Sequence, residues 1–264
     1  MLNPFNIEVP EGLDLSQIPS RSPAERVNDL PGCLNLKDGI DCPLCKNKGY
    51  IAVDTPDGDF YTQDCECRKR RAAYRKLKAS GLEDLIRIYS FKNFQTPDPW
   101  SRKVKETAGG YVTAGGAPWF AISGSPGTGK THICTAVCRR LLRDGARVRY
   151  MLWRAEAPAL KAIANDPAYE PRFRELAGAE VLYIDDFLKG KITDADMNLA
   201  FALINARYNA RSKRTILSSE LSLAEISRLD PAVSERIYQR ARGYILHAPR
   251  DAKNWRTDKE ETNA

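Results

Sequence analysis

No apolar run in this 264-residue sequence is long enough to cross a lipid bilayer as a helix, which argues against an integral membrane protein. The first fifteen residues carry acids early and lack a basic stretch followed by an apolar core, so they do not suit a secretory signal. Internal repeats and low-complexity tracts are also missing. These absences predict a cytoplasmic globular protein that has no membrane partner.

The cysteines number seven, and an odd count does not suit a disulfide framework in a cytoplasmic chain. Four of them have metal-ligand spacing, with a C-x-x-C pair followed nineteen residues later by a C-x-C pair: Cys42, Cys45, Cys65 and Cys67. Four thiolates suit a structural zinc ion, and the segment between the pairs reads as a hairpin that would bring them together. The alternative is four free thiols. Cys134 and Cys138 fit small core residues better than ligands.

Shifts in composition divide the chain into five expected segments. They are an arm over 1–40 with at most one short helix near 23–30, a zinc-binding module with a basic helix over 41–90, a linker and the start of the core over 91–117, the core over 118–250, and a C-terminal tail over 251–264. The proline-containing stretch "FQTPDPW" at 94–100 is expected to mark a boundary.

Within the core, short apolar runs alternate with longer segments of helical periodicity, which predicts an α/β fold with a parallel sheet covered on both faces. The expected strands are 119–123, 148–152, 181–184, 215–218 and 244–246. The expected helices are 131–142, 155–165, 194–210 and 222–242.

The stretch "GSPGTGKTH" satisfies the phosphate-loop pattern G-x-x-x-x-G-K-[ST] and lies between an expected strand and an expected helix. Glycines let backbone N–H groups turn toward phosphate oxygens, Lys130 adds positive charge, and the Thr131 hydroxyl suits Mg²⁺. The alternative is a glycine-rich turn. We predict that a nucleotide is bound by Gly124, Ser125, Pro126, Gly127, Thr128, Gly129, Lys130, Thr131 and His132, together with Ser218.

A phosphate loop needs an acid on a neighbouring strand to hold the metal, and "VLYIDDF" supplies two. We expect Asp185 to share the Mg²⁺ ion with Thr131, and Asp186 to orient or activate the attacking water. The alternative is that one aspartate caps the following turn. Ser218 and Ser219, at the end of another expected strand, could contact the γ-phosphate or could simply form a turn.

Net charge is +7, which favours an anionic partner such as nucleic acid. Two basic segments are candidates: 68–78 with seven cations and no acid, and 153–177 with four cations and with aromatic residues that could stack on bases. For 68–78 the alternative is a solvated helix. For the aromatic residues of the second segment, Trp153, Tyr169 and Phe173, it is a place in the core. Arg236 and Arg240 share a helix face, and an arginine there could reach the γ-phosphate of a neighbouring subunit.

In order along the chain, the four-cysteine module, the basic helix, "GSPGTGKTH", "VLYIDDFLKG", "INARY", "RTILSSELSLAEI" and "DPAVSERI" resemble the bacterial and phage helicase loaders of the DnaC/DnaI type. These loaders are AAA+ ATPases related to the IstB transposition helpers. The resemblance covers about residues 40–250 and is most specific from 181 to 237.

The resemblance implies an AAA+ P-loop NTPase core of αβα layers preceded by a small zinc-binding domain. It also implies ATP, Mg²⁺ and Zn²⁺ as cofactors, and a DnaB-type replicative helicase, single-stranded DNA and further copies of the chain as partners. The stretch Gly124–Thr131 falls on Walker A, and Asp185 and Asp186 fall on Walker B. Ser218 and Ser219 fall on the sensor 1 position and Arg236 on the arginine finger, with Arg240 a weaker candidate for sensor 2. The expected catalytic residues are Lys130, Asp185, Asp186 and Arg236.

Some features depart from the common AAA+ pattern. The second acid of Walker B is aspartate rather than glutamate, which suits slow hydrolysis, and sensor 1 is serine. Little sequence follows Arg250 to build a helical lid. A helicase loader is the first hypothesis, an IstB-like helper of transposition the second, and a nucleotide-binding scaffold with negligible turnover the third.

Overall fold

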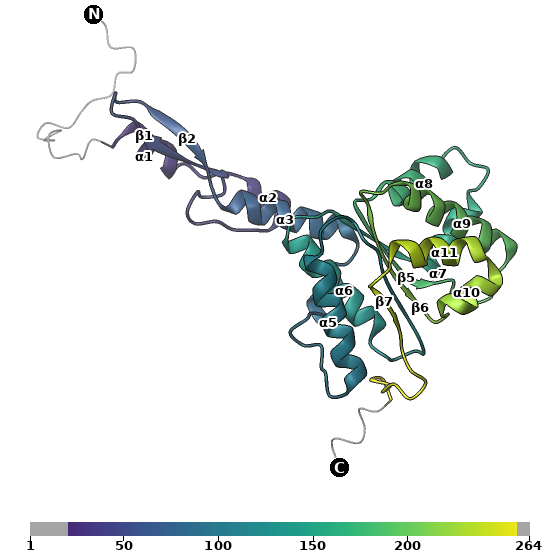
Figure 1. Cartoon of the computed structure of the whole chain (residues 1–264). Helices are drawn as coiled ribbons and strands as arrows, with labels where there is room; N and C mark the ends of the chain where they lie inside the picture. Colours follow the sequence, from purple (N-terminus) through teal and green to yellow (C-terminus); the bar gives the residue numbers. More distant parts are fainter. Residues whose placement is uncertain (1–20, 258–264) are drawn as a thin grey trace, which may run out of the picture. The chain divides into compact units, whose positions relative to one another are not determined.

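The computed structural model describes residues 21–257, and the chain divides into two compact units after Ala72. Figure 1 shows the elements coloured along the sequence. The expected arm lies outside the described residues up to position 20. Within 21–40 the helix expected near 23–30 is present as α1, Pro23–Asp29, but the expectation of at most one helix is wrong, because α2 forms over Leu34–Asp38. The domain limits expected from the sequence remain predictions.

The first unit is built on a short antiparallel hairpin. Its strands are β1 (Tyr50–Asp54) and β2 (Phe60–Asp64), as the sequence predicts, and α1, α2 (Leu34–Asp38) and the beginning of α3 (Cys67–Ser80) accompany them. The backbone N–H of Cys65 donates to Gly49 O at 2.9 Å, which extends the ladder beyond the strand ends. The hairpin therefore brings the residues after β2 back to the loop before β1.

The second unit contains a five-stranded sheet with all neighbours parallel, in the order β4-β5-β6-β3-β7. The strands are β3 (Phe120–Ser123), β4 (Val148–Leu152), β5 (Val181–Phe187), β6 (Arg214–Ser219) and β7 (Ile245–His247). Each coincides within a few residues with an expected strand. The prediction of a parallel α/β core is confirmed.

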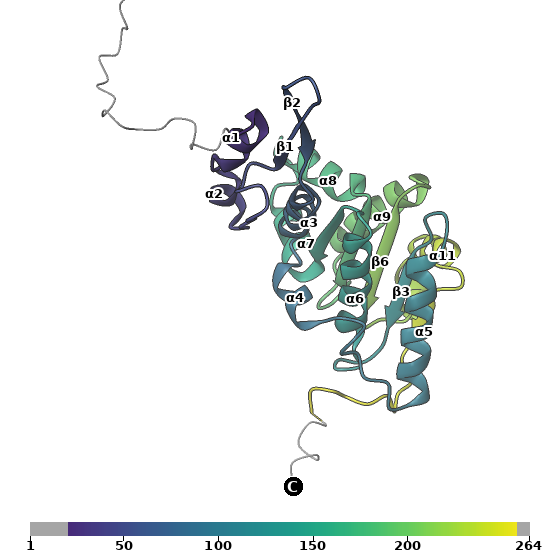
Figure 2. The same ribbon diagram turned by 90° about the vertical axis from the view of Figure 1, so that its left-hand side faces the viewer.

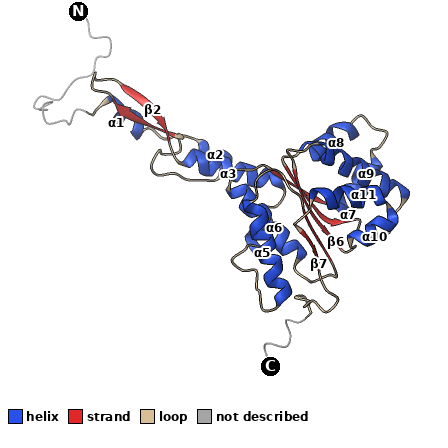
Figure 3. Cartoon of the chain, viewed as in Figure 1, coloured by secondary structure: helices blue, strands red, loops and turns tan. Residues whose placement is uncertain are grey.

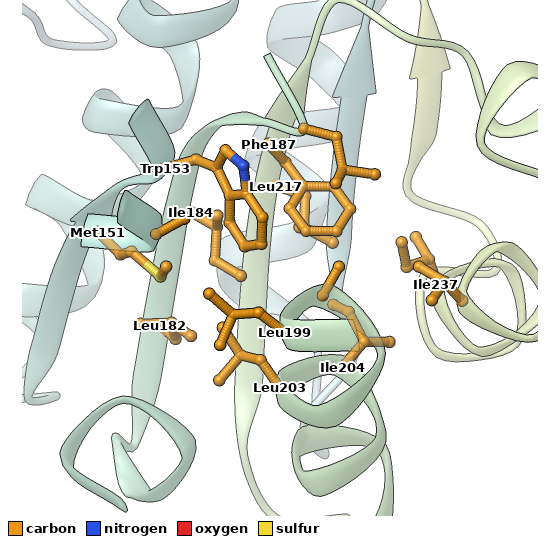
Figure 4. Packing of buried hydrophobic residues seen from close by; sticks show 14 of the residues in the cluster. Met151, Trp153, Leu182, Ile184, Phe187, Leu199, Leu203, Ile204, Leu217 and Ile237 are labelled. Atoms are coloured by element: carbon orange, nitrogen blue, oxygen red, sulfur yellow. The ribbon is translucent and has the colours of Figure 1, made fainter. Parts of the chain in front are cut away.

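Helices cover both faces of this sheet, as Figures 2 and 3 show. One face packs against α4 (Glu83–Ile88), α5 (Pro99–Thr113) and α6 (Lys130–Arg143). The other packs against α7 (Trp153–Ala162), α8 (Tyr169–Gly178), α9 (Asp194–Asn209), α10 (Leu223–Leu229) and α11 (Pro231–Arg240). Figure 4 shows the second of these apolar layers, in which the Trp153 and Phe187 rings meet edge to face with centroids 5.0 Å apart.

The single helix expected over 222–242 is wrong, because the chain forms α10 and α11 there. Pro231 lacks an N–H and cannot continue the first helix, but it suits the first turn of the next. The Asp230 side chain accepts from the backbone N–H groups of Ala232 and Val233, at 2.8 and 3.2 Å, and caps the start of α11. The sequence signal for this break is the pair Asp230–Pro231, a capping residue followed directly by a proline.

A buried arginine ties the amino ends of two strands together. Arg207, in α9, is completely buried and donates to Thr215 Oγ1 at 2.9 Å and to Ala179 O at 2.6 Å. It belongs to the "INARY" stretch of the sequence. That stretch therefore has a structural role in the described chain.

No helix within residues 21–257 has the length and apolar character needed to cross a membrane.

Candidate nucleotide site and four-cysteine cluster

The loop between β3 and α6 has the backbone form of a phosphate cradle. Gly124 and Gly127 have φ angles of 137° and 82°, which residues with side chains rarely adopt. A Cβ atom on Gly127 would lie 1.8 Å from Asn254 Oδ1, so a side chain there would have to displace Asn254 as well as adopt the positive φ. Helix α6 begins directly after this loop, at Lys130, and the N-terminus of a helix attracts anions.

Lys130 is held inside the loop. Its ammonium donates to Gly124 O at 2.7 Å and to Ser125 O at 2.8 Å, and the residue is only 6% exposed. Burial lowers the pKa of Lys130 from its ordinary value, while the charges of Glu220 and Asp186 act in the opposite direction. The loop therefore holds the lysine through neutral carbonyl oxygens, and its charge remains available to an anion.

The Asp185 carboxylate, in β5, accepts hydrogen bonds from side chains of three other elements. Thr131 Oγ1 in α6 donates to Asp185 Oδ1 at 3.3 Å, and Tyr150 Oη in β4 donates to Oδ2 at 3.1 Å. The Ser218 hydroxyl in β6 donates to Oδ1 as well. The structure thus brings together Thr131 and Asp185, which the sequence predicts as a magnesium pair. Tyr150 was missed, because only the register between β4 and β5 places it beside this carboxylate.

Ser218 is completely buried and does not line the cavity described below. Its Oγ donates to Asp185 and accepts from the backbone N–H of Asp186 at 3.0 Å. Ser219 forms part of a turn, since its Oγ donates to Phe187 O at 2.8 Å and accepts from the Leu221 N–H at 3.0 Å. Both hydroxyls are thus engaged within the protein, and Ser218 acts on the Walker B segment.

Asp186 faces the cavity with a left-handed backbone, at φ 55°. Its Oδ2 lies 3.2 Å from the ammonium of Lys189, which also contacts Glu220 Oε1 at 2.7 Å. Neither Lys189 nor Glu220 was expected at the site from the sequence. The signal for Lys189 was its place in "DDFLKG", three residues after the second acid.

A cavity of about 480 Å³ opens over the phosphate loop. Five separate segments line it: the loop with the start of α6, the end of β5, the end of β6, the stretch 88–95, and residues 255–256. The cavity residues are Ile88, Tyr89, Asn93, Phe94, Gln95, Pro126, Gly127, Gly129, Lys130, Thr131, His132, Asp186, Lys189, Glu220, Trp255 and Arg256. Most of the predicted nucleotide-binding residues thus lie at one opening, beside groups from distant parts of the chain.

His132 lies on the side of the cavity formed by residues 88–95. Its Nε2 lies 3.0 Å from Ser90 O and 3.1 Å from Asn93 Oδ1, both acceptors, so this nitrogen carries the proton. The ring centroid is 4.7 Å from that of Tyr89 and 5.0 Å from that of Phe94. Burial lowers the pKa of His132, which keeps the ring neutral at pH 7. The result is an uncharged aromatic wall, suited to a flat ligand group.

The described part of the expected C-terminal tail contacts the phosphate loop. The backbone N–H of Trp255 donates to Gly127 O at 3.0 Å, and Trp255 and Arg256 line the cavity. No local pattern in the sequence indicates this contact, because it joins residues more than a hundred positions apart.

The two candidate arginines of α11 have different surroundings. The Arg236 guanidinium is partly exposed, donates to Asn205 Oδ1 at 3.1 Å and lies over the Phe201 ring, 5.1 Å from its centroid. Arg240 donates to Ala117 O at 2.8 Å and to Lys213 O at 3.2 Å, both of which precede strands. Arg240 therefore lies at the amino edge of the sheet, whereas the phosphate loop follows the carboxyl end of β3. A sensor 2 role for Arg240 within its own chain is wrong.

The basic segment 153–177 is less available to DNA than its composition indicates. Lys161 pairs with Asp196 at 2.5 Å, Arg172 with Glu156 at 2.9 Å, and Arg174 with Glu170 at 2.7 Å. The suggestion that Trp153 stacks on bases is wrong, because its ring is buried against Phe187. Tyr169 and Phe173 stack on each other with centroids 5.7 Å apart.

The four predicted zinc ligands converge in the first unit. Their Sγ atoms all lie within 4.8 Å of one another, with 3.8 Å between those of Cys42 and Cys65 and 3.5 Å between those of Cys45 and Cys67. Tetrahedral zinc with Zn–S bonds of about 2.3 Å requires S–S separations of about 3.8 Å. The donor set and its spacing therefore fit zinc.

Arg71 supports this cluster and is not part of an exposed basic face. The residue is 1% exposed, pairs with Asp38, and donates to Ile40 O at 2.7 Å and to Asn47 Oδ1 at 3.0 Å. The same Asn47 oxygen accepts from the Cys42 N–H at 2.8 Å. Arg71 thus connects α3 to the loop that carries the first cysteine pair.

The fold and the cavity together define a P-loop ATP-binding protein of the AAA+ type. Residues 59–243 match the family described as IstB-like ATP binding protein, and the chain belongs to this family.

Relatives with known names agree with this assignment. The phage-like element PBSX protein XkdC of Bacillus subtilis (strain 168) is 32% identical over 221 residues, which cover 78% of this chain and 81% of that protein. The replicative helicase loader DnaC of Escherichia coli (strain K12) is 26% identical over 172 residues, covering 64% and 69%. The crystal structure of the DnaC helicase loader shares the fold with a TM-score of 0.55 at 20% identity, over 66% of this chain and 99% of that one.

Proposed function

We propose that the chain is an ATP-dependent loader of a DnaB-type replicative helicase onto single-stranded DNA. The observation that carries the proposal is that Lys130 and Thr131 line one cavity while Thr131 also hydrogen-bonds the buried Asp185, in a chain that has a four-cysteine module as well. The similarity to DnaC, a replicative helicase loader by name, supports the same function.

The residues have distinct proposed roles in ATP hydrolysis. The loop N–H groups and Lys130 bind the phosphates, and Thr131 and Asp185 hold Mg²⁺, which neutralises phosphate charge. Asp186, at the cavity surface, accepts the proton of the attacking water. Arg236 is partly exposed on α11, from where it serves the site of a neighbouring copy by self-association.

The four-cysteine unit is proposed as the part that docks on the helicase. Its structural zinc would fix the hairpin and the loop around Cys42 and Cys45, because a unit this small has little apolar core of its own. Five large apolar side chains in the described part of this unit are exposed and available to a partner: Leu30, Leu36, Leu44, Tyr50 and Tyr61.

A second candidate function is an ATP-dependent helper of transposition that binds target DNA. The match to the IstB-like family favours it. The cysteine module and the similarity to DnaC favour the loader.

Co-purification with the replicative helicase of the host, with and without ATP, tests the proposal. The wild-type chain should bind the helicase in a way that depends on nucleotide. The Cys42→Ser/Cys45→Ser variant should lose zinc and helicase binding but keep ATP binding. Full helicase affinity in that variant would show that docking lies elsewhere, and no helicase binding by the wild type would favour the transposition helper.

A further inference from the structure

One lysine bridges two acids at the ends of neighbouring strands. The Lys189 ammonium lies 3.2 Å from Asp186 Oδ2 and 2.7 Å from Glu220 Oε1. Asp186 is near the end of β5, and Glu220 directly follows β6. All three side chains line the candidate nucleotide cavity and are between 22% and 31% exposed. This ion pair is thus more enclosed than a typical surface pair, and it lies at the candidate site.

The backbone folds Lys189 back over Asp186. Asp186 and Leu188 both have left-handed φ angles, 55° and 57°, which are uncommon for residues with side chains. The Lys189 N–H donates to Asp186 O at 3.1 Å and closes the turn. Strained turns of this kind persist only where the surroundings hold them, and here the Phe187 and Leu188 side chains are buried. The contact between Lys189 and Asp186 is therefore built into the turn.

We propose that Lys189 is a positioning residue that restrains Asp186 and keeps ATP hydrolysis slow. This inference rests on the proposed ATPase function. In hydrolysis the water oxygen bonds to the γ-phosphorus, the bond to the β–γ bridging oxygen breaks, and the water proton passes to the Asp186 carboxylate, giving ADP and phosphate. An Asp186 oxygen that is held by an ammonium group is not free to accept that proton.

Glu220 sets how firmly the restraint acts. It makes the shorter of the two contacts with Lys189, and so it competes with Asp186 for the ammonium. Its hydrogen bond to Lys189 also raises the pKa of that lysine, which keeps the ammonium charged at neutral pH. Movement of Lys189 toward Glu220 would release Asp186.

The test is steady-state hydrolysis of Mg·ATP by the full chain and four variants. Lys189→Met should raise kcat about fivefold with KM unchanged, since a partly exposed ion pair is worth about 1 kcal/mol and 1.36 kcal/mol corresponds to tenfold in rate. Lys189→Arg should move kcat back toward the wild-type value. Glu220→Gln should lower kcat, because the ammonium then has only Asp186 as an ionic partner. The double variant Lys189→Met/Glu220→Gln should behave like Lys189→Met alone.

Lys191→Met is the matched control, because Lys191 is exposed in the same loop and does not line the cavity. Equilibrium binding of a fluorescent ATP analogue to each protein separates the two levels of the proposal. If the wild type binds the analogue but Lys189→Met leaves kcat unchanged or lower, the restraint is overturned while the nucleotide site stands. If the wild type does not bind the analogue, both are overturned.

Discussion

At the scale of single residues, the two neighbouring aspartates have different surroundings. Asp185 is 3% exposed and accepts hydrogen bonds from Thr131, Tyr150 and Ser218, whereas Asp186 faces the cavity. Adjacent residues in an extended strand point to opposite faces, but the left-handed φ of Asp186 breaks that alternation. The two carboxylates can therefore serve different steps at one site.

We predict that Asp185→Asn weakens Mg²⁺-dependent ATP binding, because an amide is a poorer magnesium ligand than a carboxylate. Asp186→Asn should keep binding near the wild-type level but lower kcat by about 100-fold or more, the usual contribution of a general base. Analogue binding and phosphate release measure the two effects separately. Equal loss of binding in both variants would contradict the division of roles.

Arg71 lies in a segment that reads as an exposed basic helix, yet its side chain is buried and hydrogen-bonded. We predict that Arg71→Leu weakens zinc binding by about 10- to 100-fold, since residues that orient metal ligands commonly contribute that much. Arg68→Leu is the control, because Arg68 is exposed and pairs only with Asp64 at the surface. Competition with a chromophoric chelator measures zinc affinity, and equal affinities in the two variants would refute the role of Arg71.

At the scale of elements, the strands and the phosphate loop could be predicted because their signals are local. Buried parallel strands read as short apolar runs, and the loop needs glycine and lysine at fixed spacing. The break between α10 and α11 also had a local signal, the Asp230–Pro231 pair. The contact of Trp255 with Gly127, and that of Tyr150 with Asp185, could not be predicted, because they depend on how distant segments meet in space.

We predict that the C-terminal stretch around Trp255 contributes to nucleotide binding. Arg256 lines the cavity, and a guanidinium in contact with a phosphate is worth about 1.5–3 kcal/mol as a charged hydrogen bond. Arg256→Ala should therefore weaken ATP binding by at least about tenfold. Arg250→Ala is the control, because Arg250 is exposed and does not line the cavity. Isothermal titration with a non-hydrolysable analogue checks this, and equal affinities would show that the stretch only covers the loop.

At the scale of the whole molecule, the two basic segments differ in how many of their cations are free of ion pairs. Within residues 153–177, three of the four cations are paired with acids at distances of 2.9 Å or less. In the described part of α3, by contrast, Lys69, Arg70 and Arg75 are exposed and form no ion pair. Composition alone could not separate the two segments, because the pairing acids lie on other turns and other helices.

We therefore predict that single-stranded DNA binds through α3. The triple variant Lys69→Gln/Arg70→Gln/Arg75→Gln should lower affinity and reduce the slope of log K against log salt by about two, since each phosphate contact to a single strand contributes about 0.7. Arg172→Gln/Arg174→Gln is the matched control and should change little. Fluorescence anisotropy with a labelled oligonucleotide at several salt concentrations measures both. A larger loss in the control would place the DNA contact in the second segment.

If the loop around Lys130 and the acid at Asp185 form one Mg·ATP site, nucleotide binding must depend on both Lys130 and Mg²⁺. Equilibrium binding of Mg·ATP to the wild type and to Lys130→Ala should show saturable, Mg²⁺-dependent binding in the wild type and no measurable binding in Lys130→Ala, with zinc content unchanged. Equal affinity in the two proteins, or binding that is indifferent to Mg²⁺, would contradict such a site.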